Sequence, residues 1–472
     1  MPLPAWPVAC SSTRVENSPL SASRSAPALV HGLEDPVPPG AAVLVSAQHV
    51  AAMVVGTITP PLILAGLLDF SPADTAALVS MALLSSALGT LLQTTRPGPV
   101  GSGLLSVTGT SFSFLQPLIA AGQAGGLALM LGLSLAAAPV QLVLAPFLPG
   151  LRRVFTPLVS GVVVLLIGLT LIPSALFGIV APVAPRAPVW AGGALAAVVI
   201  AALIAAQSVS RPWARLAGVL LALGAGSLVA VLAGWAPGLA PAAEGSSWVA
   251  LPRWLPHGLA FDWALLAPFA FIYLVSLLEA MGDMTATAQL SGLPTDGPEH
   301  WRRMRGGILA DGLTSFASAL FGGFPSTTYA QNNGVIQITG VASRRLGPIM
   351  AAMLALLGLF PVVGRLVGAI PPAVIGALAL VLFGLVAVSG LRLLAAAGLT
   401  QRNCLVVALS LAIGLGLPSQ PEWLKALPAF CRAVFESGIA GGGLAALVLN
   451  LVLPGASDAA SADGAKASPR GD

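Results

Sequence analysis

Charged side chains are scarce in this sequence. Of 472 residues, only 8% are Asp, Glu, Lys or Arg, whereas 56% are hydrophobic. Soluble globular proteins carry about 25% charged residues, so the composition excludes that class. Cysteine is also rare, and Cys10, Cys404 and Cys431 fit neither a metal-binding nor a redox spacing. Walker, kinase and Gly-x-Ser-x-Gly motifs are absent, which argues against ATP-driven pumping by this chain and against hydrolase chemistry.

Long apolar runs fill most of the chain, and its mean hydropathy is +0.92. A helix needs about 20 apolar residues to cross a bilayer, and Pro, Gly and Arg divide this chain into about 14 such segments. We therefore predict an all-α polytopic membrane protein. The expected segments are 42–68, 75–93, 103–121, 126–147, 157–178, 188–207, 213–233, 264–290, 304–323, 326–341, 345–365, 372–392, 402–417 and 437–453.

The basic residues alternate between the two ends of these segments. If the N-terminus is cytoplasmic, 16 of the 21 Lys and Arg lie inside, in agreement with the positive-inside rule. The net charge of +4 then reflects membrane topology and not nucleic-acid binding. Both termini are predicted to be cytoplasmic, with disordered tails at 1–40 and 454–472. The five basic residues predicted outside are Arg186, Arg253, Arg365, Lys425 and Arg432.

Two segments begin with polar, β-prone residues and then become helical. Segment 103–121 contains Gly-Thr-Ser-Phe-Ser-Phe, and segment 326–341 contains Ser-Thr-Thr-Tyr-Ala-Gln-Asn-Asn-Gly. Broken spans in corresponding places of two halves indicate a transporter binding site. If the third and tenth segments correspond, the chain consists of two inverted seven-span repeats, with spans 3 and 10 part extended strand and part helix. Two unrelated kinked helices are the alternative.

Three acidic side chains lie inside apolar segments. Glu279 and Asp283 are four residues apart, so they share one helical face. Two like charges so close should not both stay ionised at neutral pH, and such a pair can load and release a proton. Asp311 lies near the middle of the next span. A carboxylate at the bilayer centre costs about 2.5–3.5 kcal/mol or more, so these acids favour a transporter, although a structural role for each is the alternative.

Amide and imidazole groups add to this candidate site. An amide offers a donor and an acceptor side by side, which complements the edge of a nucleobase. Gln331 fits that role, whereas Asn332 and Asn333 also fit a structural role in joining the broken span. His49 is the only histidine inside a predicted span. It is either a buried structural group or a group that positions a neighbour. No metal site is expected, because no second His or Cys has a suitable spacing.

These residues resemble the signature of the nucleobase–cation symporter family of nucleobase–ascorbate transporter type. The family pattern is met by Gln331-Asn332-Asn333-Gly334 through Thr339-Gly340, by Gln48-His49, and by the run from Gly109 to Phe114. The similarity extends from about residue 40 to residue 453 and is closest to bacterial proton-coupled xanthine permeases.

The resemblance implies a core domain (41–155 and 264–370), a gate domain (156–263 and 371–453), a homodimer, and an elevator-like movement in the cell inner (plasma) membrane. It implies a purine substrate, a proton as coupling ion and no cofactor. Glu279 and Gln331 would bind the base, and the backbone around Ser113, Phe114 and Thr328 would line the site. Asp283, Asp311, His49 and Asn332 would support it.

Several other functions stay open at this point. Uric acid is the nearest alternative substrate, followed by uracil. Glu279-x-x-x-Asp283 also resembles one acidic motif of an intramembrane prenyltransferase, although such an enzyme needs two of them. A passive channel is a further alternative, which non-saturating uptake would favour.

Overall fold

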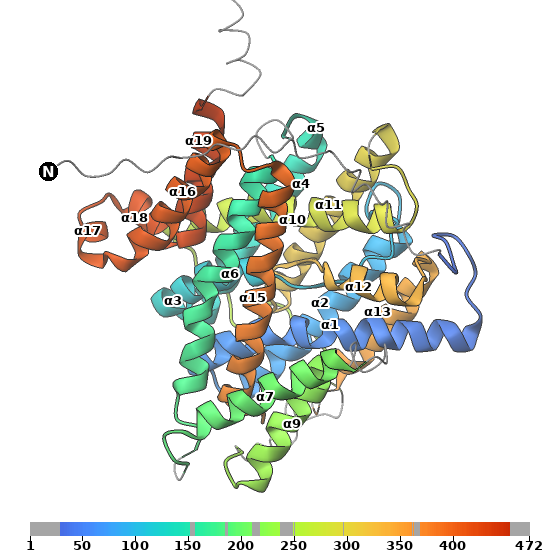
Figure 1. Ribbon diagram of the computed structural model, residues 1–472, viewed down its shortest axis with the longest axis horizontal. Coiled ribbons are helices and arrows are strands. Elements are labelled where there is room, and N and C mark those ends of the chain that lie inside the picture. Colours follow the sequence, from blue (N-terminus) through green and yellow to red (C-terminus); the bar gives the residue numbers. More distant parts are fainter. Residues whose placement is uncertain are drawn as a thin grey trace, which may run out of the picture.

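The computed structural model describes residues 29–151, 156–184, 187–209, 218–236, 249, 251–295, 297–360, 362 and 369–453. Cys10 and residues 454–472 lie outside this part of the chain. The described residues form helices and one two-stranded sheet (Figure 1). The first half contains α1 (Pro39–Leu67), α2 (Pro72–Thr95), β1 (Thr108–Thr110), η1 (Phe112–Phe114), α3 (Leu115–Ala137), α4 (Pro139–Leu144), η2 (Ala145–Phe147), α5 (Leu148–Leu151), α6 (Pro157–Val180), α7 (Ala191–Ser208) and α9 (Gly218–Leu232).

The second half repeats this order of elements. It contains α10 (Trp263–Leu290), α11 (Gly297–Leu320), β2 (Ser326–Thr328), α12 (Gln331–Thr339), η3 (Arg344–Leu346), α13 (Gly347–Leu359), α15 (Pro372–Ala397), α16 (Gln401–Gly416), η4 (Leu417–Ser419), α17 (Pro421–Lys425), α18 (Ala429–Glu436) and α19 (Gly438–Val452).

Each half supplies seven segments. By length and composition, 8 helices of the described part could cross a membrane. The stretch Phe112–Phe147 is 36 residues long, but its helix leaves helical geometry at Gly125 and Gly126, so it provides two segments. Shorter helices, namely α9, α12, α13 and α19, and the more charged α11 supply the others. The predicted all-α membrane fold with two seven-segment halves is confirmed.

The two broken spans meet at the centre of the fold. β1 pairs with β2 antiparallel, in the register Thr108↔Thr328, Gly109↔Thr327 and Thr110↔Ser326. Because the strands run in opposite directions and each is followed by a helix, the N-terminal ends of α3 and α12 flank the strand pair from opposite sides. The strand-then-helix form predicted for spans 3 and 10 is confirmed.

Hydroxyl groups of neighbouring helices cover the outer edges of this strand pair. From α2, Thr90 Oγ1 accepts the Thr108 N–H at 3.2 Å, and Ser86 Oγ donates to the Thr108 carbonyl. From α11, Ser315 Oγ accepts the Ser326 N–H at 3.0 Å. A strand edge cannot face lipid with unpaired amides. The corresponding helix of each half therefore completes the hydrogen bonding of its own strand.

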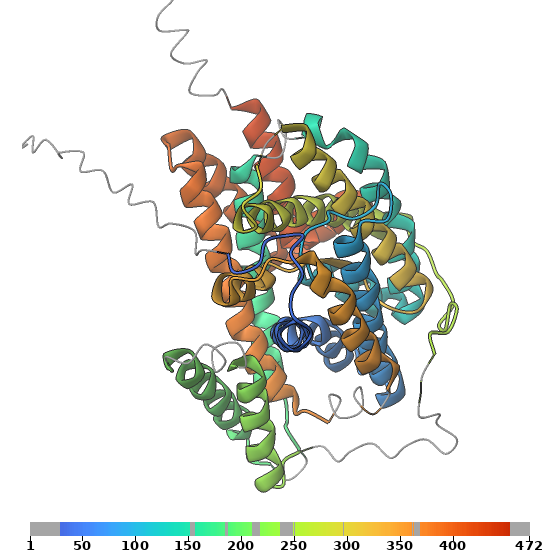
Figure 2. The same cartoon turned by 90° about the vertical axis from the view of Figure 1, so that its right-hand side faces the viewer.

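The helices pack in two groups. In one group, α6 packs along α15, and the pairs α7–α9 and α16–α19 pack against these two helices. Figures 1 and 2 show these pairs near opposite ends of α6 and α15. In the other group, α2 packs on α13, α11 packs on α3 and α4, and α1 and α10 contact the broken spans. The strand pair belongs to this second group.

A short extended segment precedes each half and crosses to the other half. Before α1, the Val30 N–H donates to Gly340 O at 2.8 Å and the Ala342 N–H to His31 O at 2.9 Å. Before α10, the Ala260 N–H donates to Ala128 O at 2.9 Å. Residues 29–38 belong to the tail predicted as disordered, yet they are bound to the junction after α12, whereas residues 1–28 lie outside the described part.

The close packing at Gly109 leads to a prediction. A Cβ atom there would lie 2.5 Å from Thr57 Oγ1 and 2.7 Å from the Tyr329 ring. We expect Gly109→Ala to lower the stability of the purified protein by about 1–3 kcal/mol, the usual cost of overpacking a core. A lower midpoint of thermal unfolding in detergent would show this. Gly384→Ala is the matched control, because nothing lies within 4 Å of the added Cβ; equal midpoints for the two variants would contradict the prediction.

Candidate functional site

The first contact of the candidate site joins α10 to the broken span of the first half. Ser113 Oγ, in η1, donates to Glu279 Oε2 at 2.8 Å. Ser113 is buried, and Glu279 is half-buried. The carboxylate therefore lies at the end of the extended run, and its other oxygen makes no hydrogen bond with a described residue. A half-buried carboxylate held by a single hydroxyl can accept further N–H donors.

The other two acids lie near Glu279. Asp283 is half-buried one turn further along α10, within electrostatic range of Glu279 and Asp311. Asp311, on α11, is fully buried, and its Oδ1 accepts a hydrogen bond from Gln93 Nε2 at 2.9 Å. The structure thus brings together the three acids that the sequence singled out. They meet where α10 and α11 face the strand pair.

The three amides of α12 differ in their partners. Asn332 is buried and its Nδ2 donates to Leu105 O, before β1. Asn333 Oδ1 accepts from Thr287 Oγ1 of α10 at 2.7 Å. The Gln331 side chain is exposed, and its amide makes no hydrogen bond with a described residue. Asn332 and Asn333 join the broken span to its neighbours, as their structural interpretation requires, and the Gln331 amide stays accessible to a ligand.

Helix α1 contacts the broken span of the second half. His49 is fully buried beside Asn332, and neither ring nitrogen makes a hydrogen bond of normal geometry with a described residue. About two helical turns further along α1, Thr57 lies next to Tyr329. The Tyr329 hydroxyl donates to Thr110 O of the opposite strand at 2.7 Å. His49 therefore lies next to α12, beside Asn332.

Phe114 and Thr328 contribute in different ways. The Phe114 ring is fully buried, with its centroid 4.5 Å from that of Tyr273 and 6.4 Å from that of Phe269. Its side chain belongs to the packed interior, so only its backbone can line a site. Phe112 is partly exposed and packs edge-on against Phe383 of α15 at 5.7 Å. Thr328 is buried in β2, opposite Thr108.

Buried polar atoms without a hydrogen-bond partner gather around the broken spans. Such atoms are rare in proteins, because leaving one unpaired costs about 1–3 kcal/mol. Here they mark groups that a polar ligand can engage. In the described part of the chain they include Ser111 Oγ, Thr327 Oγ1, Thr328 Oγ1, Asn332 Oδ1, Asp311 Oδ2 and both ring nitrogens of His49. The described residues contain no cluster of His, Cys, Asp and Glu that could hold a metal ion.

Sequence reasoning did not identify Gln93, Tyr273 and Tyr329. Gln93 is the buried donor to Asp311. The Tyr273 hydroxyl, on α10, donates to Ser134 O of α3 at 2.9 Å, so each tyrosine joins one half of the chain to the other. The whole chain contains only 2 tyrosines, so their rarity could have drawn attention to both residues. Gln93 is a weaker case, because the sequence shows only an amide at the end of an apolar run.

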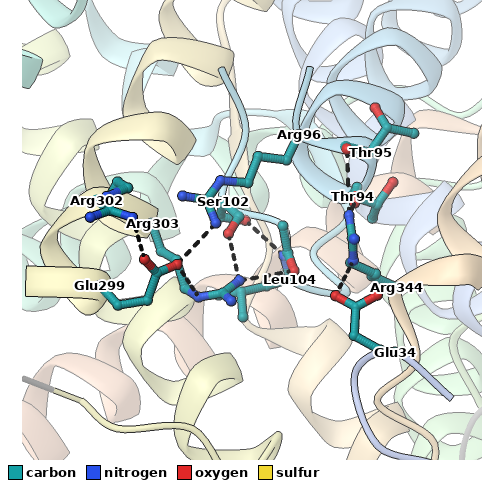
Figure 3. Close-up of polar contacts among 11 residues, drawn as sticks. Glu34, Thr94, Thr95, Arg96, Ser102, Leu104, Glu299, Arg302, Arg303 and Arg344 are labelled. Carbon is teal, nitrogen blue, oxygen red and sulfur yellow. Dashed lines mark hydrogen bonds and ion pairs between the residues drawn. The ribbon is translucent and has the colours of Figure 1, made fainter. Parts of the chain in front are cut away.

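An ionic cluster lies where α2 ends and α11 begins. Around Glu299, Arg96 Nη1 lies 3.1 Å from Oε1, Arg302 Nη1 lies 3.0 Å from Oε2, and Arg303 Nε lies 3.4 Å from Oε1. Figure 3 shows these side chains beside Ser102, whose carbonyl accepts from Arg303 Nη1 at 3.1 Å. The hydrogen bond from Arg96, with the charges of the three arginines, lowers the pKa of Glu299. The cluster fixes the loop between α2 and β1.

A cavity of about 470 Å³ separates the end of α1 from α6 and α15. It is lined by apolar residues such as Leu62, Phe177 and Ile375, and it lies away from the three acids. The cavity lies between the two groups of helices. The candidate site is therefore the polar region at the broken spans, where the three acids lie and the unpartnered hydroxyls gather, with Gln331 at the start of α12.

Known proteins of similar sequence are permeases. A family model described as a permease family matches residues 40–423. The chain is 41% identical over 442 residues to the xanthine permease XanP of Escherichia coli (strain K12), which covers 90% of this chain and 95% of that protein. It is 39% identical over 440 residues to the xanthine permease XanQ of the same organism, covering 90% and 94%.

Solved structures of similar fold are membrane transporters. The transmembrane domain of the cyanobacterium bicarbonate transporter BicA matches with a TM-score of 0.58 and 14% identity, over 89% of this chain and 99% of that one. The murine Slc26a9 anion transporter in its inward-facing state matches with a TM-score of 0.60 and 12% identity, over 86% and 67%. At these identities the likeness concerns the fold alone.

The ionic cluster leads to a prediction of pH dependence. Because the pKa of Glu299 in the folded protein lies below its ordinary value of 4.5, its ionised form stabilises the fold above that pH, and this stabilisation is lost as the pH falls through the folded-state pKa. We expect Glu299→Gln to unfold at a lower temperature than the natural chain at neutral pH. The difference should shrink in acid and, since Glu299 is 51% exposed, at high salt. Thermal unfolding at several pH values tests this, and a difference that persists in acid would contradict it.

Proposed function

The chain belongs to the permease family whose model it matches over residues 40–423, and we propose that it is a secondary active transporter that imports a purine nucleobase, xanthine, together with a proton. Membership of this family makes the chain a transporter and not an enzyme, so the prenyltransferase alternative is wrong. The curated relatives named above support xanthine as the substrate.

One observation carries the proposal: Ser113 holds Glu279 at the broken span of the first half, and the second oxygen of the carboxylate is left without a described partner. Xanthine is a flat ring that presents N–H groups and carbonyls at its edge. A carboxylate accepts N–H donors, and an amide pairs with one donor and one acceptor. Glu279 and Gln331 would bind the edge of the base, and the unpartnered hydroxyls of Ser111 and Thr328 would add polar contacts.

The proton would be handled by the acids on α10 and α11. Glu279, Asp283 and Asp311 lie within electrostatic range of one another, so one added proton relieves repulsion in the whole group. A proton and a base bound at one place can then cross together. Asn332 and His49, next to each other on α12 and α1, would hold the signature helix in position for this step.

Alternating access would follow from relative movement of the two groups of helices. We assign the group around the strand pair to a core domain (41–155 and 264–370) and the group around α6 and α15 to a gate domain (156–263 and 371–453). The cavity between α1, α6 and α15 supports a boundary at which the groups can move. Within one chain, only 17% of the most apolar part of Gln401–Ser419, the stretch that contains α16, is buried. This exposure supports a homodimer contact or a lipid contact there. The protein would lie in the inner membrane with both termini cytoplasmic.

Replacing Glu279 tests its proposed role. Glu279→Gln keeps the size of the side chain but removes its charge and one acceptor. Because a hydrogen bond to a charged group contributes about 1.5–3 kcal/mol, we expect uptake of labelled xanthine to fall by about 10- to 100-fold or more. Membrane content, measured by quantitative blotting, should be unchanged. Glu422→Gln is the control, since Glu422 is 83% exposed and, among the residues that the structure describes, pairs with Lys425 alone, at 2.6 Å. Normal uptake by Glu279→Gln would refute the role of this residue.

Competition defines the substrate and the coupling ion. Uptake of radiolabelled xanthine should be saturable, should be reduced most by unlabelled xanthine, and should collapse when a protonophore dissipates the proton gradient. Stronger competition by uric acid or by uracil would assign the chain to that substrate instead. Uptake that does not saturate and ignores the protonophore would indicate a passive channel.

A further inference from the structure

Gln93 makes hydrogen bonds with every polar atom of its side chain. It lies in the last turn of α2 and is fully buried. Its Nε2 donates to Asp311 Oδ1 at 2.9 Å and to the Gly307 carbonyl at 2.9 Å. Its Oε1 accepts the Ser102 N–H at 3.1 Å. One amide thus connects α2, α11 and the loop before β1.

These partners fix the orientation of the amide. A backbone carbonyl can only accept, and a backbone N–H can only donate. Since Gly307 offers a carbonyl and Ser102 an N–H, the two ends of the amide cannot exchange. The NH₂ group therefore faces Asp311, and Asp311 Oδ1 must be an acceptor. A proton on this carboxyl can then be carried only by Oδ2, which is buried and makes no hydrogen bond of normal geometry with a described residue.

The surroundings of Asp311 make this donor important. The charged groups acting on it are carboxyls, namely Glu279 and Asp283 of α10. The neighbouring elements add neutral groups: Gln141 of α4 packs beside Gly312, the next residue of α11, and from β2 the Thr328 backbone N–H is a further donor to the Asp311 carboxyl. Gln93 is the one neighbouring side chain of the described part that donates a hydrogen bond to this carboxyl. A donor to a carboxylate favours its ionised form.

The backbone around Gln93 is held as firmly as its side chain. The Gly103 N–H donates to the Gln93 carbonyl at 2.8 Å. Arg303 Nη1 donates to the carbonyls of Ser102 and Gly103 at 3.1 Å and 3.3 Å, as Figure 3 shows for Ser102. The ionic cluster around Glu299 therefore fixes the loop, and the loop fixes Gln93.

We propose that Gln93 is a positioning residue for proton binding at Asp311: it confines the proton to Oδ2 and sets the pH at which that carboxyl takes it up. The proposal deepens the proton-coupled transport proposed above and rests on it. In this arrangement the ionised form of Asp311 keeps the donor from Gln93 at Oδ1, and Oδ2 is the oxygen that takes up the proton.

The test follows the protonation of Asp311 directly. The full-length protein is purified, reconstituted in lipid vesicles and titrated while the C=O stretch of protonated carboxyls is recorded by infrared difference spectroscopy. The Asp311 band is the one that Asp311→Asn removes. Gln93→Met keeps the volume of the side chain but has no donor. We expect its Asp311 band to titrate about one pH unit higher than in the natural chain, the shift produced by losing one hydrogen bond to a charged group.

A matched control and a second variant complete the experiment. Gln116→Met makes the same change at an amide that donates to Thr170 O at 3.4 Å, and it should leave the Asp311 midpoint unchanged. If Gln93→Met does not fold, Gln93→Asn keeps the amide but is one methylene too short to reach all three partners, and it should shift the midpoint in the same direction.

The outcomes separate this inference from the proposed function. An unshifted midpoint in the Gln93 variants, or no titrating Asp311 band in the natural chain, overturns the role of Gln93. Xanthine uptake is measured in the same vesicles. Uptake with an unshifted midpoint leaves the proposed function standing without this inference, whereas a shifted midpoint without xanthine uptake supports the Gln93–Asp311 relation and overturns the substrate.

Discussion

A backbone amide inside a membrane must find its hydrogen-bond partner within the protein, and the centre of this fold is arranged to meet that requirement. Two spans stop being helical for a few residues, and β1 and β2 satisfy each other. Hydroxyls of α2 and α11 supply the remaining partners. Because the extended backbone is completed in this way, the helices that follow it can begin near the middle of the protein. The α12 amides and the unpartnered hydroxyls lie at those helix starts and strands, and α10 and α11 bring the three acids to them.

The two halves share a fold, but they carry different polar side chains at the site. In the second half, α10 presents Glu279 to the broken span of the first half. In the first half, α1 presents His49 and Thr57 to the broken span of the second half. All three acids of the site therefore come from one half. A repeated scaffold with different side chains lets one side of the site carry charge while the other side provides packing and neutral hydrogen bonds.

Much of this arrangement was predictable from local patterns in the chain. Apolar runs of sufficient length mark the segments, and polar β-prone residues before Leu115 and Gln331 mark the broken spans. The spacing of Glu279 and Asp283 places both on one helical face. What local patterns could not predict is long-range contact. Gln93 and Asp311 are 218 positions apart, and Tyr329 reaches Thr110 over 219 positions. Composition likewise cannot distinguish a free tail from residues 29–38, whose order comes from backbone bonds to the other half.

The pairing of β1 with β2 also constrains how the protein is made. During translation the ribosome delivers β1 to the membrane long before residue 326 has been synthesised, so the strand must wait with its amides only partly satisfied by α2. Contacts between such distant parts of a chain form late, because a long loop has to be closed first. The centre of this fold therefore cannot be completed until the second half of the chain has reached the membrane.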